Sequence, residues 1–268
     1  MSLVCNYNLN DLKKLDFRNA PFCPYGNLKW NRYYWERKQE VPDYEEDYWG
    51  KTVDPDGNNR NMLSDEEWRK QVEYIQWIVD IVNSQPGGKL IDVGCGVGYF
   101  LSAVNAKWER HGVDISNVAL EIAAKYASVK QGEFPKLDYG SDYYDLAFMS
   151  HVIEHVEDPL EYVKAVYRIL KVGGVFIISS PDFDSGCARR FKNNYRMLHD
   201  KGHISLFTSA SLIKMLEDYK FRIIHVEYPY FDSIWFTKEN LLRMEDTSKV
   251  SPPFYGNDVT VFAEKVPR

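Results

Sequence analysis

Three glycines, at positions 94, 96 and 98, narrow the choice of folds for this 268-residue chain more than any other feature. They follow the apolar run Leu90–Val93, which predicts a buried strand, and they precede a helical pattern. Glycine lets the backbone turn tightly and approach a ligand, because a Cβ would occupy the space that the ligand needs. The run therefore predicts a strand, a ligand-binding loop and a helix. A tight turn without a ligand is the other interpretation.

Short β-rich runs alternate with helical patterns from residue 89 onward. We expect strands near 89–93, 110–114, 129–133, 145–150, 174–180, 221–227 and 258–264. Helices are expected near 98–107, 117–127, 159–170 and 209–218. This alternation is typical of a parallel sheet with crossover helices. The predicted fold class is α/β, a Rossmann-like, mostly parallel sheet of seven strands with helices on both faces.

Two helix starts carry capping signals. Ser64 precedes an amphipathic run and Glu67 follows three residues later, which predicts a capping box. Asp158, Pro159 and Glu161 mark the helix expected at 159–170 in the same way.

The first 62 residues lack this alternation and are rich in aromatic side chains. We interpret residues 1–62 as an extension or lid and residues 63–268 as the main domain, with an insertion near 232–256. Rings in the extension would exclude water from a site; the candidates are Tyr33, Tyr34, Tyr48 and Trp49. The alternative is that they only fasten the extension to the core.

Charge and hydrophobicity exclude several classes of partner. The formal net charge of −6 disfavours nucleic acid. We find neither an apolar run near the roughly 20 residues that span a bilayer nor a signal segment, so we expect no membrane span and a cytoplasmic protein. The four cysteines are too scattered for a zinc or redox motif, and we expect no metal.

The glycine spacing separates two classes of cofactor. The dinucleotide fingerprint G-x-G-x-x-G needs a glycine where Tyr99 stands, so a pyrophosphate is disfavoured. Asp114 ends the next predicted strand, 22 residues after Asp92, about where an acid that binds a ribose falls in such units.

With Asp92 ahead of the loop, the run reads D-x-G-x-G-x-G and resembles class I S-adenosylmethionine-dependent methyltransferases. The resemblance implies that the loop contacts the amino acid part of S-adenosylmethionine and that Asp114 binds its ribose. After the third strand, Glu133 and Phe134 resemble the adenine site, although Glu133 could equally be a solvated loop acid. The implied cofactor-binding residues are Asp92, Gly94, Cys95, Gly96, Gly98, Tyr99, Asp114, Ile115, Glu133, Phe134 and Ser150.

Residues 150–159 read SHVIEHVEDP and contain the pattern H-x-x-E-H. On a helix this pattern would pair His151 and His155 on zinc, as in a hydrolase. A predicted strand ends just before it and a helix starts just after it, so we expect a connecting turn instead. The stretch resembles a methyltransferase subgroup often associated with sugars, cell-surface glycans and other small metabolites. That resemblance places His151 near the methyl group, whereas we expect Glu154 and His155 to brace the turn.

Residues 201–208 match the same subgroup, which implies that His203 enters the pocket from the opposite side. Methyl transfer from a sulfonium mainly needs alignment, and a hydroxyl acceptor also needs a base, for which a histidine near neutrality is suited. We expect a methyltransferase that releases S-adenosylhomocysteine, with His151 as base and His203 as partner or alternate. The favoured acceptor is a hydroxyl of a sugar or glycan precursor. Alternatives are N-methylation of an amino sugar or other small metabolite, a zinc hydrolase, or a non-catalytic cofactor-binding protein.

Overall fold

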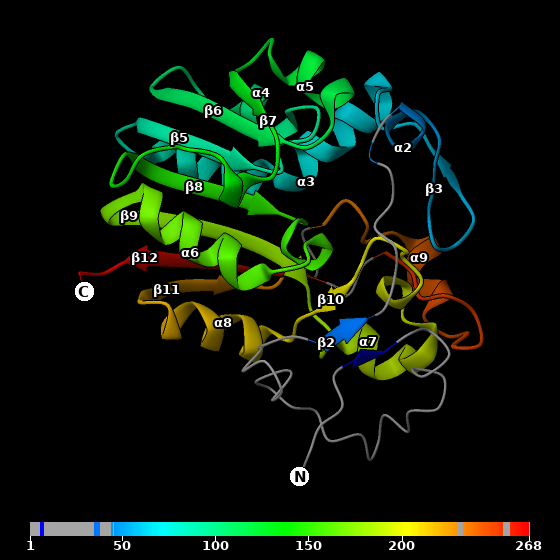
Figure 1. Ribbon diagram of the computed structural model, residues 1–268. Coiled ribbons are helices and arrows are strands. Elements are labelled where there is room, and N and C mark those ends of the chain that lie inside the picture. The colour runs from blue at the N-terminus through cyan, green and yellow to red at the C-terminus, as the bar shows by residue number, and fades with distance from the viewer. Residues whose placement is uncertain are drawn as a thin grey trace.

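Seven strands form one sheet in the order β11-β12-β9-β8-β5-β6-β7 (Figure 1). The computed structural model describes residues 6–7, 35–37, 44, 46–229, 233–253 and 258–267. The strands are β5 Gly88–Val93, β6 Trp108–Asp114, β7 Ser128–Gln131, β8 Tyr144–Ser150, β9 Leu170–Pro181, β11 Phe221–Glu227 and β12 Asp258–Lys265. Within this sheet β12 runs antiparallel to both of its neighbours, β9 and β11, and the other pairs are parallel. The predicted fold class is confirmed.

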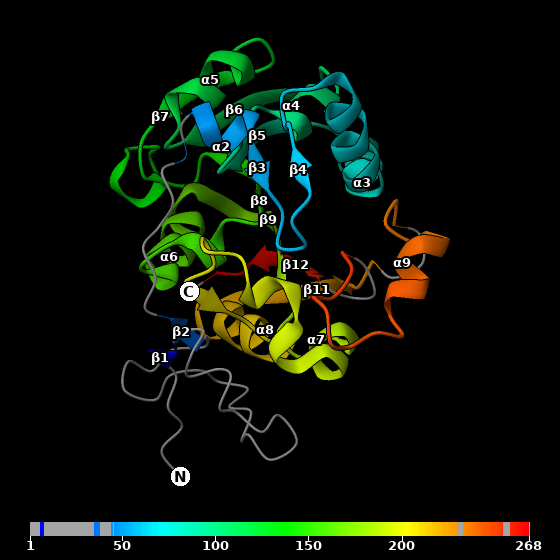
Figure 2. The same ribbon diagram turned by 90° about the vertical axis from the view of Figure 1, so that its right-hand side faces the viewer.

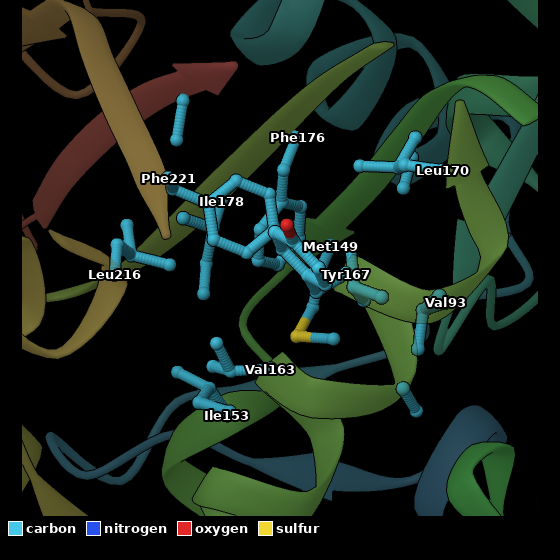
Figure 3. Close-up of a cluster of buried hydrophobic side chains, with 14 of the residues drawn as sticks. Val93, Met149, Ile153, Val163, Tyr167, Leu170, Phe176, Ile178, Leu216 and Phe221 are labelled. Carbon is cyan, nitrogen blue, oxygen red and sulfur yellow. The ribbon is translucent and has the colours of Figure 1, made fainter. Parts of the chain in front are cut away.

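Alternate residues of the central strands serve two hydrophobic cores, one on each face of the sheet. Leu90, Leu146 and Ile177 pack with residues of helices α3 Asp65–Ser84, α4 Tyr99–Ala103 and α5 Asn117–Ala123. Their sequence neighbours Ile91, Ala147 and Ile178 face helices α6 Pro159–Ile169 and α8 Ser209–Asp218. Figure 3 shows part of this second core. Because strand side chains alternate in direction, apolar residues at both parities require helices on both faces, as predicted.

The capping signals are half confirmed. Ser64 Oγ accepts a hydrogen bond from the backbone N–H of Glu67, but the Glu67 carboxylate accepts from Gln71 instead of returning to Ser64. Glu161 likewise pairs with Lys164 and not with the cap. Partners one turn away on the same helix compete for these carboxylates, so both predicted boxes lack their second half.

The strand order reverses between β5 and β8. From β5 the chain continues to β6 and β7 on one side, and then crosses to β8 and β9 on the other. The loops after β5 and β8 therefore lie at the carboxyl edge of the sheet at the point where the strand order changes, which is where open α/β sheets bind ligands. The glycine loop follows β5, and the H-x-x-E-H stretch follows β8.

Elements outside the sheet reach this edge. The short helix α2 Glu46–Gly50 is followed by a hairpin of β3 Thr52–Val53 and β4 Asn59–Arg60. Figure 2 shows the hairpin extending toward α9 Lys238–Arg243, and Arg243 donates a 2.8 Å hydrogen bond to Asp56 in the hairpin turn. The strands β1 Asn6–Tyr7, β2 Trp35–Arg37 and β10 Ser205–Leu206 form a separate small sheet.

The remaining short elements were not predicted. They are α7 Gly186–Phe191, η2 Phe134–Lys136, η3 Ile153–His155, η4 Lys192–Asn194, η5 Arg196–Leu198 and α9, which lies in the predicted insertion. Two of the lid candidates, Tyr33 and Tyr34, lie outside the described residues. Of the helices that the structure describes, none is long and apolar enough to cross a membrane.

Candidate active site

The glycine loop after β5 adopts a backbone that only glycine accepts easily. Gly94 and Gly96 have φ values of +74° and +50°. A Cβ at Gly94 would stand 2.2 Å from Val152 Cγ2, so the loop packs directly on the turn that follows β8. Positive φ and this close approach together explain the glycine pattern. They bring the two predicted halves of the site, the loop and the histidine stretch, into contact.

Asp114, at the end of β6, is bound to the glycine loop. Its Oδ2 accepts a 2.8 Å hydrogen bond from the N–H of Gly96, and its Oδ1 accepts a 2.9 Å bond from the N–H of Ser116. A carboxylate only accepts hydrogen bonds, so the chemistry of this side chain suits the hydroxyl groups of a ribose. Burial, and then the nearby charge of Asp114, raise the pKa of Asp92 well above its usual value. The loop and acid fit the adenosine and amino acid parts of S-adenosylmethionine.

Of the residues predicted to contact the adenine, some lie at the surface and some in the hydrophobic core. Gly132 N–H donates a 2.9 Å hydrogen bond to the backbone oxygen of Asp114, which brings the turn after β7 beside the acid. Glu133 is exposed and pairs with Lys136 at 2.7 Å, whereas Phe134 is 2% exposed and belongs to the hydrophobic core. Ile115 is 44% exposed and offers an apolar surface next to Asp114.

The side chains of Cys95 and Tyr99 pack into the structure around the glycine loop. Cys95 is buried, and burial raises the pKa of its thiol, so the thiol stays protonated. The Tyr99 hydroxyl donates to the backbone oxygen of Met62, and its ring packs edge-on against Trp68 at 4.8 Å. Tyr99 therefore fastens α4 to the chain that precedes α3.

The indole of Trp49, in α2, lies against the glycine loop. A Cβ at Gly96 would stand 2.7 Å from this ring. Its Nε1 is 3.0 Å from Ser116 Oγ and 3.1 Å from the backbone oxygen of Tyr44, and it donates to both. Tyr48 packs edge-on against both Tyr44 and Trp49. Of the lid candidates, Tyr48 and Trp49 thus gather at the glycine loop.

The H-x-x-E-H stretch lies in a connecting turn, as predicted. Ser150 ends β8 in register with Ser179, and His151 follows with a φ of +54°, a conformation that is uncommon for residues other than glycine. Ile153–His155 make a single 3₁₀ turn. Nδ1 of His151 is 3.1 Å from Glu154 Oε1 and bonded to it, so His151 and His155 do not form the helical zinc pair of a hydrolase.

Glu154 is buried and holds the turn through hydrogen bonds. It is 1% exposed, and besides His151 it accepts a 3.3 Å hydrogen bond from Ser180 Oγ. Next to it, His155 and His203 pack ring to ring at 4.7 Å. Side-chain atoms of Glu154, His155 and His203 that could bind a metal ion lie within 4.8 Å of one another. This group contains His203, whereas the H-x-x-E-H pattern would have used His151. His203 is 4% exposed, and its Nδ1 is bonded to the backbone oxygen of Met197 at 3.0 Å.

The two histidines of the motif carry different charges at neutral pH. Burial alone would lower the pKa of His151, but the carboxylates of Asp258 and Glu154 outweigh it and raise this pKa to about 9. Burial, and then the neighbouring His203, lower the pKa of His155 to about 4. Burial opposes ionisation of Glu154, yet its hydrogen bond to His151 lowers its pKa. His151 is therefore charged where we expected a group that titrates near neutrality.

Comparison with known proteins identifies the family. A family profile described as a methyltransferase domain matches residues 64–226, which is more than half of the chain. The chain belongs to the class I S-adenosylmethionine-dependent methyltransferases. The methyltransferase also shares its fold with an S-adenosylmethionine-dependent methyltransferase of Thermotoga maritima, described as a possible histamine N-methyltransferase. That match has a TM-score of 0.53 and 22% identity and covers 74% of this chain and 90% of the other.

Two curated relatives methylate different atoms. The methyltransferase is 29% identical over 117 residues to a ubiquinone biosynthesis O-methyltransferase of Bordetella avium, covering 40% of this chain and 48% of that protein. It is 28% identical over 130 residues to phosphoethanolamine N-methyltransferase 3 of Arabidopsis thaliana, covering 42% of this chain and 26% of that protein. The chain therefore spans less than half the length of these two relatives.

Two residues near the site, Tyr44 and Asp258, were not predicted from the sequence. Glu154 was expected to brace the turn, and its bond to His151 adds a contact that the spacing of three residues allows. Tyr44 and Asp258 carried no such signal, because they lie far along the chain from the motif that they approach.

Proposed function

We propose that this methyltransferase transfers a methyl group from S-adenosylmethionine to a small polar acceptor, and that a hydroxyl of a sugar or glycan precursor is the favoured acceptor. The contact between Asp114 and Gly96 carries the proposal, because it joins an acid suited to ribose hydroxyls to the glycine loop at the carboxyl end of β5. The contact between Gly94 and Val152 supports it further, since it holds the histidine turn beside that loop.

The cofactor-binding roles follow from these contacts. We assign the amino acid part to the loop Gly94–Gly98, the ribose to Asp114, and the base to the surface around Ile115 and Glu133. Asp92, Cys95, Tyr99, Phe134 and Ser150 complete the proposed set of cofactor-binding residues. When bound, S-adenosylmethionine supplies a methyl group made electrophilic by a positive sulfur. Because such a transfer needs no acid for the leaving group, the residues of the chain would align the partners and accept a proton.

Oxygen is favoured because the site is rich in groups that handle protons. His151, His155, His203 and Glu154 lie together beyond the loop. A hydroxyl must lose its proton during transfer, whereas a neutral amine needs a base less. We assign His151 and His203 to the acceptor side, with His151 able to act as base once it is deprotonated above its pKa of about 9. N-methylation of an amino sugar or other small metabolite is the second candidate, and the plant relative named above supports it.

Two measurements test the proposal. Calorimetry on folded protein should detect binding of S-adenosylmethionine and of S-adenosylhomocysteine. The variant Asp114→Asn should bind both compounds more weakly. A screen of sugar nucleotides and small polar metabolites, read by release of S-adenosylhomocysteine, should then identify the acceptor. If amino sugars are methylated and no hydroxyl compound reacts, the methylated atom is nitrogen and not oxygen. Cofactor binding without any turnover would favour a non-catalytic protein, and absence of binding would refute the function.

A further inference from the structure

A tyrosine from the N-terminal extension reaches the second histidine of the motif. The hydroxyl of Tyr44 lies 3.0 Å from Nδ1 of His155, although the two residues are 111 positions apart in the sequence. Their rings meet edge-on with centroids 6.0 Å apart. The contact joins the extension to the turn after β8, where the acceptor side of the proposed site lies.

Tyr44 also contacts the aromatic residues that lie against the glycine loop. Its backbone oxygen accepts a hydrogen bond from Nε1 of Trp49, and its ring packs on Tyr48 at 4.7 Å. Trp49 in turn lies against Gly96. A single short segment therefore touches both the proposed cofactor loop and His155, so the position of one is coupled to the position of the other.

His155 is enclosed by groups from several elements. A Cβ at Gly202 would stand 2.7 Å from its Nδ1, and the ring of His203 packs against it. The charged or titratable groups facing it are Tyr44, Glu154, Asp200 and His203, with the backbone of Gly202. Burial and His203 lower the pKa of His155 more than Glu154 and Asp200 raise it, so the ring is neutral at pH 7. Burial also raises the pKa of Tyr44, so its phenol stays protonated.

We propose that Tyr44 and His155 form the proton-accepting pair of the methyltransferase at neutral pH: Nδ1–H of His155 donates to the Tyr44 oxygen, and its Nε2 takes the proton of the acceptor. This inference rests on the proposed function. The acceptor O–H bond breaks toward Nε2, and an oxygen lone pair forms the new C–O bond. The electrons of the C–S bond go to the sulfur. Tyr44 is a positioning residue, because it selects the tautomer in which Nε2 holds the lone pair.

The pair explains why a charged His151 is compatible with turnover. At pH 7 His151 is protonated, bonded to Glu154 and stabilised by the charge of Asp258, and it has no lone pair to offer. His155 is the neighbouring imidazole in the neutral form. The pair predicts that kcat/KM stays flat from about pH 6 to about pH 8, whereas His151 as the only base predicts a rise toward pH 9.

Tyr44→Phe tests the pair without knowledge of the acceptor. Nitrogen-15 NMR of the full chain reports the tautomer of His155, and we expect Nδ1–H in the wild type and a shift toward Nε2–H in Tyr44→Phe. Tyr143→Phe removes an equivalent phenol from the remote chain after β7 and should leave the tautomer unchanged. With the acceptor from the screen, Tyr44→Phe should lower kcat about tenfold and His155→Gln about 100-fold or more, with the Kd for S-adenosylmethionine changed less than threefold.

Several results would overturn the pair while leaving the methyltransferase function intact. One is an unchanged tautomer in Tyr44→Phe; another is full turnover in His155→Gln together with loss of turnover in His151→Gln at pH 7. One equivalent of zinc in the purified protein, lost in His203→Ala, would make Glu154, His155 and His203 a cation site instead. Absence of cofactor binding would refute the proposed function, and because the pair rests on that function, its catalytic assignment would fall as well. Far-UV circular dichroism checks that each variant folds.

Discussion

The indole nitrogen of Trp49 donates a 3.0 Å hydrogen bond to the hydroxyl of Ser116, which also caps α5 by accepting from the N–H of Ala119. A ring from the extension is thus bonded to the residue two positions after the proposed ribose acid, Asp114. The extension is part of the site's framework, and its removal should affect the cofactor loop directly.

Trp49→Phe should weaken cofactor binding while keeping most of the ring. The variant loses the indole donor and also the outer edge of the indole that lies on Gly96. A single net hydrogen bond is worth about 1 kcal/mol, or roughly fivefold in Kd, so we expect a loss of affinity of at least that size. Titration calorimetry with S-adenosylhomocysteine measures the change. Trp77→Phe, in which the original indole packs on Phe262 in the core, serves as control and should bind as the wild type does. Equal affinities for Trp49→Phe and the wild type would show that this bond does not support the loop.

Gly94→Ala should destabilise the chain and abolish cofactor binding. Alanine is strained at positive φ by about 1 kcal/mol or more, and here its Cβ would also overlap Val152. Gly173→Ala provides the matched control, since Gly173 has a φ of +80° with no atom near its Cβ position. Urea denaturation should show a loss of about 1 kcal/mol for the control and a larger loss for Gly94→Ala.

Val152→Ala should rescue part of that loss, because it removes the two nearest of the three Val152 atoms that the new Cβ meets. The double variant Gly94→Ala/Val152→Ala is then more stable than the sum of the two single losses predicts. Strict additivity would mean that strain at positive φ, and not contact with the turn after β8, requires the glycine.

Asp114→Asn should weaken S-adenosylmethionine binding about 10- to 100-fold, because hydrogen bonds to a charged group are worth about 1.5–3 kcal/mol. The amide can still accept from Gly96 or Ser116 through its single oxygen, so the fold should persist. Asp138→Asn removes a charge from another carboxylate that accepts a backbone N–H, that of Gly140, and should leave the Kd unchanged. Similar losses in both variants would indicate a general charge effect.

Stability should fall as the pH rises through the range in which His151 loses its proton. The folded state raises the pKa of His151 from 6.5 to about 9, so it binds the proton more tightly than the unfolded chain does. That contribution is complete below about pH 6.5 and disappears as the pH passes 9. Melting temperatures measured from pH 6 to 10 should decline less in His151→Gln. The control variant His225→Gln changes an exposed histidine of β11, and its melting temperature should decline with pH as that of the wild type does.

The sequence pattern located every strand of the main sheet but not every boundary. The start of β9 was placed at 174, whereas the strand begins at Leu170, directly after α6. Gly173 and Gly174 suggested a turn, yet pairing with β8 extends through them across an irregular register. Helices α4 and α5 end earlier than predicted, at Ala103 and Ala123. Helices α7 and α9 have six residues each, too few for helical periodicity to be detected.

The glycine loop, the alternation of strands and helices, and the acid after the second strand were all readable along the chain, because each depends on local backbone needs or on periodic burial. The charges of His151 and His155 could not be predicted from the sequence. They depend on Asp258, His203 and burial, and the Tyr44 contact spans 111 positions. A proton affinity is set by the groups that surround an atom in space, and those groups meet only when the chain has folded.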